Sequence, residues 1–93
     1  MKNLEFDYPI DYDIYSIEEI TIIIDFFNTI EQCYLDGVLL EDYKKIYKKY
    51  KTVVRTKSEE NSMLKDFKKV SGYDGYLTTK EMKNEKTIIR IKV

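Results

Sequence analysis

The longest apolar segment of this chain, residues 16–37 (SIEEITIIIDFFNTIEQCYLDG), constrains the fold more than any other feature. Apolar side chains recur in it at steps of three and four residues, the period of one helix face: Ile20, Ile23, Ile24, Phe27, Ile30 and Tyr34. Three further residues widen this face: Ile22, Phe26 and Cys33. The polar side chains left for solvent are Asp25, Thr29, Glu31, Gln32 and Asp36. We therefore expect a central helix that several neighbours cover.

The β-branched run at residues 20–24 also suits a strand. Two observations favour the helix. The apolar pattern continues for about eighteen residues, which is too long for a typical strand. Ser16 followed by Glu19 forms a capping box, the usual signal for the start of a helix, and Gly37 is placed to end it in the left-handed conformation.

Three more helices are predicted after the first. The second covers residues 40–54, where a stripe of Tyr43, Ile46, Tyr47, Tyr50 and Val53 or Val54 alternates with lysines. A second capping box, Thr56 with Glu59, opens the third helix, and Gly72 ends it with Tyr73 placed to pack back on its last turn. Its expected buried face is Met63, Leu64, Phe67 and Val70. Residues 76–84 suit a short fourth helix, with the inward side chains Tyr76, Leu77 and Met82.

The two ends of the chain have an extended pattern. Leu4, Phe6 and Tyr8 alternate with acids, which suits an extended arm lying on the core. Ile89, Ile91 and Val93 alternate with bases, which is the period of a strand. This tail could pair with the arm, add to the sheet edge of a partner, or fray. The predicted fold is one all-α domain over residues 1–93, a small four-helix bundle of three strong helices and a short fourth, with an extended N-terminal arm and a strand-like C-terminal tail.

Composition excludes several kinds of chemistry. The chain has no histidine and one cysteine, so zinc-finger sites, thiol–imidazole pairs and disulfides within the chain are excluded. Asp11 and Asp13 begin like a calcium loop, but Ser16 and Ile22 stand where that loop needs glycine and glutamate. No phosphate-binding glycine loop or membrane-spanning run is present, and the acids near the first residues lead us to expect no signal peptide. We expect a cytoplasmic protein that is not an enzyme and has no metal and no cofactor.

Two sets of side chains are candidates for binding a partner. Nine tyrosines are more than a core of this size readily holds, and five lie outside the strongest helical stripes: Tyr8, Tyr12, Tyr15, Tyr73 and Tyr76. The lysines of the second helix are the other set: Lys44, Lys45, Lys48 and Lys49, continued by Lys51. Plain solvation is the favoured explanation for both sets, with tyrosines at the rim of the core and lysines on a solvated helix face. The functional alternatives are a non-catalytic module that binds an unknown protein partner and, less favoured in a slightly acidic chain, a nucleic-acid-associated protein using the basic face.

The charges are separated along the chain. Residues 1–43 contain eleven acids and one base, whereas residues 44–57 contain seven bases and no acid. The net charge of −1 therefore hides two blocks of opposite sign. Such blocks steer association between copies when salt is low. We expect a monomer or weak dimer at physiological salt that self-associates at low ionic strength.

Several of these motifs together resemble the YktA-like family, short uncharacterised proteins of low-GC Gram-positive bacteria. The motifs are YPID at 8–11, SIEEI at 16–20, DFF at 25–27, DGV at 36–38, and SGY with a further tyrosine at 71–76. The resemblance covers roughly residues 8–77 and implies a small four-helix bundle with no assigned activity. The chain departs from the family pattern at Leu39, where members usually have a polar cap residue, and at Arg55, where they commonly have proline.

Overall fold

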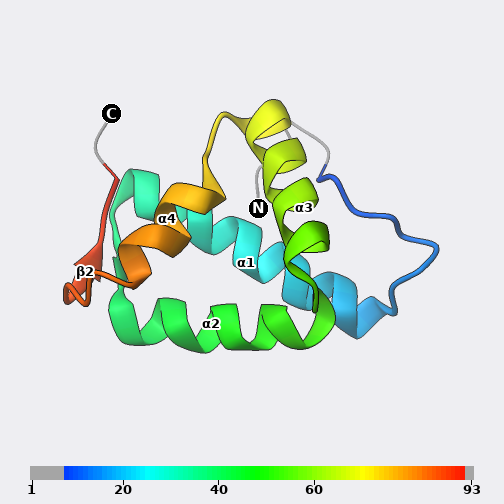
Figure 1. Ribbon diagram of the computed structural model, residues 1–93, viewed down its shortest axis with the longest axis horizontal. Coiled ribbons are helices and arrows are strands. Elements are labelled where there is room, and N and C mark those ends of the chain that lie inside the picture. Colours follow the sequence, from blue (N-terminus) through cyan, green and yellow to red (C-terminus); the bar gives the residue numbers. More distant parts are fainter. Residues whose placement is uncertain (1–7, 92–93) are drawn as a thin grey trace.

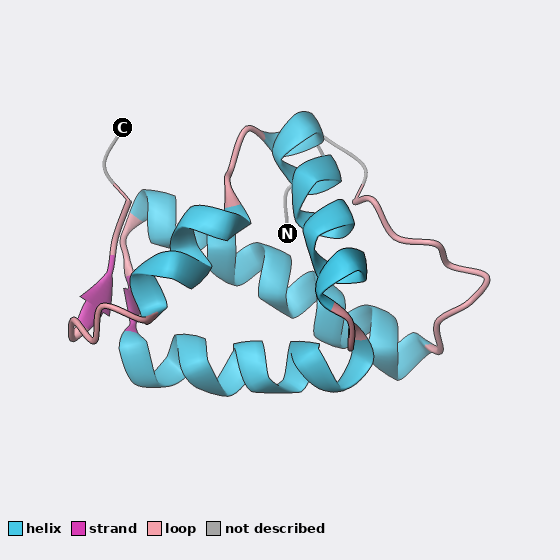
Figure 2. Cartoon of the chain, viewed as in Figure 1, coloured by secondary structure: helices cyan, strands magenta, loops and turns pink. Residues whose placement is uncertain are grey.

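The computed structural model describes residues 8–91. Within this range the predicted all-α fold is confirmed (Figures 1 and 2), with elements α1 (Ile17–Leu35), β1 (Val38–Leu39), α2 (Leu40–Val53), α3 (Lys57–Ser71), α4 (Gly75–Met82) and β2 (Ile88–Ile89). Three predicted apolar positions of the chain ends lie outside the described residues: Leu4, Phe6 and Val93.

The helices α1 and α2 form a long pair, with α3 and α4 packed across it (Figure 1). A connection of four residues reverses the chain, so α2 runs back along α1. The ring of Phe26 in α1 lies 4.2 Å from that of Tyr50 and 5.8 Å from that of Tyr43 in α2, centroid to centroid. The residues of α1 near Phe26 are therefore level with the middle of α2.

The apolar face of α1 is the centre of the core, as the sequence predicts. Its fully buried side chains are Ile23, Phe26, Phe27, Ile30 and Cys33. Phe27 stacks on Phe67 of α3 with the ring centroids 4.3 Å apart and the planes at 3°. Burying each such side chain contributes about 1.5–3 kcal/mol to stability. The expectation that Thr29 faces solvent is wrong, because Thr29 is 7% exposed and donates its hydroxyl to the carbonyl of Asp25.

The capping box at Ser16 is confirmed in full. The hydroxyl of Ser16 accepts from the backbone N–H of Glu19 at 3.1 Å, and the Glu19 carboxylate accepts from the Ser16 N–H at 2.9 Å. The second box is only half formed. Thr56 accepts from the N–H of Glu59, but the Glu59 carboxylate accepts from the hydroxyl of Tyr15 instead (3.2 Å). A competing donor from the N-terminal segment therefore takes the place of the Thr56 N–H.

The C-terminal tail pairs with a segment that the sequence does not mark as a strand. β2 runs antiparallel to β1, with Val38 opposite Ile89 and Leu39 opposite Ile88. The tail also satisfies backbone groups at two helix ends. The N–H of Leu40, whose helix has no side-chain cap, donates to the Thr87 carbonyl at 2.7 Å, and the N–H of Ile91 donates to the Cys33 carbonyl at 2.9 Å. The first of these bonds replaces the cap that Leu39 cannot supply, and the second satisfies a carbonyl near the end of α1.

The inward faces of α3 and α4 differ in part from the prediction. Val70, Tyr76 and Leu77 are 43%, 57% and 41% exposed, so their expected burial is wrong. The buried residues of α4 are Gly75, Thr78 and Thr79, while Met82 packs against the core as predicted. The reason is a close helix approach: a Cβ at Gly75 would lie 2.6 Å from Ile30 and 2.7 Å from Leu64. This contact turns the small residues of α4 inward and its large ones outward.

Candidate functional site

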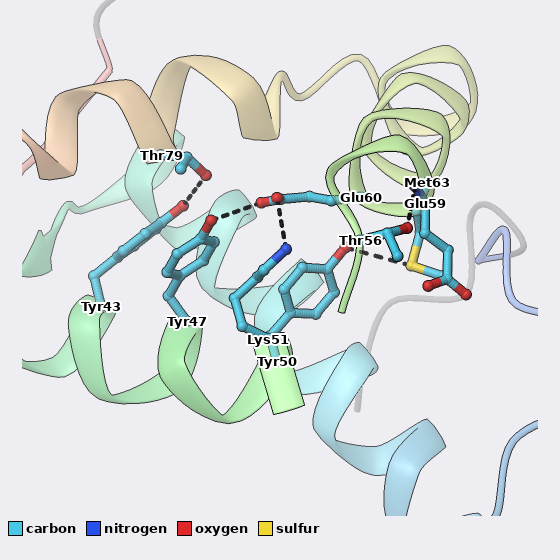
Figure 3. A network of polar contacts seen from close by, with 9 residues as sticks. All are labelled: Tyr43, Tyr47, Tyr50, Lys51, Thr56, Glu59, Glu60, Met63 and Thr79. Carbon is cyan, nitrogen blue, oxygen red and sulfur yellow. Dashed lines mark hydrogen bonds and ion pairs between the residues drawn. The ribbon is translucent and has the colours of Figure 1, made fainter. Parts of the chain in front are cut away.

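The tyrosines of α2 point into the fold, and each hydroxyl has a partner (Figure 3). Tyr43 shares hydrogen bonds with Thr78 at 2.7 Å and Thr79 at 3.1 Å. The Tyr50 hydroxyl donates to the sulfur of Met63 at 3.5 Å. Burial raises the pKa of the Tyr43 and Tyr50 hydroxyls well above the ordinary value of tyrosine. These side chains are structural, as their helical spacing predicts.

A buried carboxylate connects α2 to α3. Glu60 is 2% exposed, and its oxygens accept from the Tyr47 hydroxyl at 2.8 Å and from the Lys51 ammonium at 3.0 Å (Figure 3). Burial and, next, the hydrogen bond to Glu60 raise the pKa of Tyr47. Lys51 therefore does not belong to an exposed basic face as the sequence suggests, because its ammonium group neutralises Glu60.

The five candidate tyrosines separate into two groups. Tyr8 packs against the rings of both Phe27 and Phe67, Tyr15 donates to Glu59, and Tyr73 packs on the ring of Tyr34. These three tyrosines are therefore half-buried parts of the structure. Tyr12 and Tyr76 are 55% and 57% exposed. They lie on different elements, the N-terminal segment and α4, and the structure does not bring the five together into one surface.

The lysines of α2 form a more continuous surface. We call Lys44, Lys45, Lys48 and Lys49 the lysine face, and all four are exposed. Lys44 lies 3.9 Å from Glu85, both side chains being largely in solvent, which contributes little. The other three form no ion pair with any residue in the described range 8–91. Helical spacing directs Lys45 and Lys49 along one edge of α2, away from the side that carries Lys51.

That edge borders a groove between α1 and α2, with a volume of about 460 Å³. We call it the α1–α2 groove, and its lining is Asp25, Asn28, Thr29 and Gln32 of α1 with Val38, Asp42, Lys45 and Ile46. The half-buried side chains of Val38 and Ile46 supply apolar surface. The groove therefore combines apolar contact area with a carboxylate on the α1 side and an ammonium group on the α2 side.

Among residues 8–91 there is no cluster of three carboxylates or thiols that could hold a metal ion. Burial raises the pKa of the Cys33 thiol to about 12, which disfavours the nucleophilic thiolate. No helix in the described range has the length and apolar character needed to cross a membrane.

Sequence reasoning missed Glu60 and the groove. Glu60 stands in the first turn of α3, where an acid is ordinarily explained by the helix dipole. A weak signal existed, since Tyr47 and Lys51 are four residues apart on one helix face and both can donate to a carboxylate. The groove depends on how α1 and α2 pack, which a pattern within either helix does not reveal.

Fold and surface together define a small all-α protein with a charged helix-pair face. The sequence matches the model of the uncharacterised protein family UPF0223 over residues 5–89, and the chain belongs to this family. It is 38% identical to a UPF0223 protein of Staphylococcus aureus (strain bovine RF122 / ET3-1), over 96% of this chain and 97% of that protein. It is also 38% identical to a UPF0223 protein of Bacillus mycoides (strain KBAB4), over 95% of this chain and all of that protein.

The family match confirms the resemblance seen in the motifs. The family is uncharacterised, and the two relatives named here come from low-GC Gram-positive bacteria. The match also extends that resemblance toward the C-terminus. It continues past residue 77 through α4 and β2, the part of the tail that pairs with β1.

Proposed function

We propose that this protein is a non-catalytic, cytoplasmic interaction module that binds an acidic segment of a protein through the α1–α2 groove and the lysine face. The observation that carries the proposal is the uncompensated charge of that face. Three of its four lysines have no ion pair among residues 8–91, and one of these three, Lys45, lines the α1–α2 groove. An acidic amphipathic helix fits such a surface, since its apolar side can contact Val38 and Ile46 while its carboxylates reach the lysines.

Nucleic acid is the second candidate, because a row of exposed lysines also suits phosphates. One feature favours protein. The tyrosines interleaved with the lysines, Tyr43, Tyr47 and Tyr50, are held inside the fold and are not available to stack on bases.

Binding of two fluorescent probes tests the proposal. The first is a glutamate-rich amphipathic peptide of about 20 residues and the second a single-stranded DNA of about 20 nucleotides, each measured by anisotropy at about 50 and 200 mM salt. We expect the peptide to bind more tightly at both salt concentrations, and Lys45→Glu/Lys49→Glu to weaken it at least about tenfold. The matched control, Lys65→Glu/Lys69→Glu on α3, makes the same change in net charge and should bind like the wild type. Tighter binding of the DNA, or equal loss in the control, would overturn the proposal.

A further inference from the structure

We infer that a second copy of this chain is an occupant of the α1–α2 groove, in a weak two-fold dimer that places α1 of each copy on α2 of the other. This inference rests on the proposed function in that it uses the same groove and lysines. It identifies the acidic helix as α1 itself.

The two walls of the groove carry different charges: Asp25 lies on the α1 wall, and Lys45 lies with Asp42 on the α2 wall. α1 contains four acids and no base in its whole length of residues 17–35. The middle of α2 contains only bases, and Lys45 and Lys49 lie on its groove edge. Each copy therefore carries both halves of a complementary surface. In an isologous contact every such pair forms twice, so one good pair counts double.

Charge selects one of the two simple ways to place two helix pairs face to face. A two-fold axis perpendicular to the helices would put α1 on α1 and α2 on α2, with like charges facing. An axis parallel to the helices puts α1 of one copy on α2 of the other. Because Phe26 is level with the middle of α2, this operation brings Asp25 between Lys45 and Lys49 of the second copy. Opposite charges then meet on both sides of the axis.

The acid on the α2 wall does not contradict this placement. Asp42 lies near the start of α2, about one and a half helical turns before Tyr47. In antiparallel helices this is level with Glu31 and Gln32, five and six residues after Phe26, and of these two it is Gln32 that lines the groove. Asp42 therefore faces an amide that can donate a hydrogen bond instead of another carboxylate.

The contact is small, so the dimer depends on its charges. α2 has 14 residues and is about 21 Å long, and packed helices lie about 10 Å apart. A face of roughly 20 by 20 Å on each copy gives a total of about 800 Å², below the 1,200–2,000 Å² of stable complexes. Apolar burial alone is therefore too small to hold the dimer, and screening by salt should dissociate it.

Sedimentation equilibrium at about 20 and 300 mM salt tests the inference with a charge swap. We expect the dissociation constant to rise at least about tenfold at the higher salt. At low salt, Asp25→Lys and Lys45→Glu should each weaken the dimer about tenfold or more, because each puts like charges opposite one another. The double variant Asp25→Lys/Lys45→Glu restores opposite charges and should return to within about threefold of the wild type. Lys69→Glu, on α3, is the control for net charge.

Two results would overturn the dimer. One is a mass equal to the monomer at both salt concentrations, and the other is a double variant as weak as the two single variants together. Failure of the dimer can be distinguished from failure of the proposed function. If the glutamate-rich peptide still binds and Lys45→Glu/Lys49→Glu still releases it, the groove takes an acidic partner other than this chain. If the peptide does not bind and no dimer forms, both the proposed function and the inferred dimer are wrong.

Discussion

Replacing Lys51 with methionine should destabilise the fold more than any other single lysine change on α2. The substitution keeps the length of the side chain and removes the ammonium group that lies 3.0 Å from the Glu60 carboxylate. Glu60 is 2% exposed, so water cannot take over this role. The carboxylate would keep the hydrogen bond from Tyr47 but lose the charge that compensates its own.

The magnitude follows from the burial of the pair. Breaking a fully buried ion pair by removing one partner costs about 3–5 kcal/mol, whereas an exposed pair contributes under about 1 kcal/mol. The Glu60 side chain is 3% exposed and that of Lys51 28%, and Tyr47 remains as a donor. We therefore expect a loss of about 2–3 kcal/mol in the free energy of unfolding. The matched control is Lys44→Met, whose pair with Glu85 is 3.9 Å long and largely exposed, and which should cost at most about 0.5 kcal/mol.

Urea denaturation followed by circular dichroism measures both variants. With a slope of about 1–3 kcal/mol per molar urea, the Lys51→Met midpoint should fall by on the order of 1–2 M, with the slope itself unchanged. A second measurement isolates the pair. In a Glu60→Gln background the carboxylate charge is gone, so Lys51→Met should cost at most about 1 kcal/mol. The reasoning is refuted if Lys51→Met costs no more than Lys44→Met, or if its cost is the same in both backgrounds.

Three further predictions concern a cap, two glycines and alkaline pH. Ser16→Ala removes half of a complete capping box and should lower the urea midpoint by the equivalent of about 0.5–2 kcal/mol; an unchanged midpoint would contradict it. Gly37→Ala should lower the free energy of unfolding more than Gly72→Ala. Both glycines have positive φ, but only a methyl group at Gly37 comes within 3.0 Å of β2. Equal losses for the two variants would contradict the packing of β2 against Gly37. Because burial raises the pKa of Tyr43 and Tyr50, the folded state keeps protons that the unfolded chain releases above about pH 10. Stability should therefore fall above that pH by up to about 1.4 kcal/mol per pH unit for each tyrosine, in addition to a loss that the buried Cys33 thiol, whose pKa is also raised, begins at a lower pH. Equal urea midpoints at about pH 9 and 11 would refute this.

The sequence predicts helices well here because local signals and burial agree. The apolar period of α1 and the reciprocal pair of Ser16 and Glu19 lie within one element, so both appear in the sequence as they do in the structure. The same holds for the start of α3 at Thr56 and its end at Gly72, which has φ +85°. Where a neighbouring element competes, the local signal fails. Glu59 is drawn from the cap to Tyr15, 44 residues earlier in the chain.

The parts that could not be predicted depend on contacts between distant residues. β1 has only two residues and exists because Ile88 and Ile89, some fifty positions later, pair with it. The orientation of α4 depends on the missing side chain of Gly75 against Ile30 and Leu64, so the apolar pattern of α4 alone gives the wrong face. For the candidate site the exposure of the four lysines was predictable from their spacing, whereas the groove beside them requires the packing of two helices.

The stability of the fold does not explain the charges of the lysine face. Lys44 with Lys48, and Lys45 with Lys49, are pairs of like charge four residues apart, and each such pair destabilises a helix by about 0.2–0.5 kcal/mol. Glutamate at two of these positions would turn the repulsion into attraction and stabilise the helix. Acids on a facing helix of the same chain would do the same. Instead Asp25 of α1 lies across the groove, where no ion pair joins it to α2 among residues 8–91. An acidic helix docked in the groove would supply the missing charges, so the arrangement that weakens the isolated chain is the one that favours a complex.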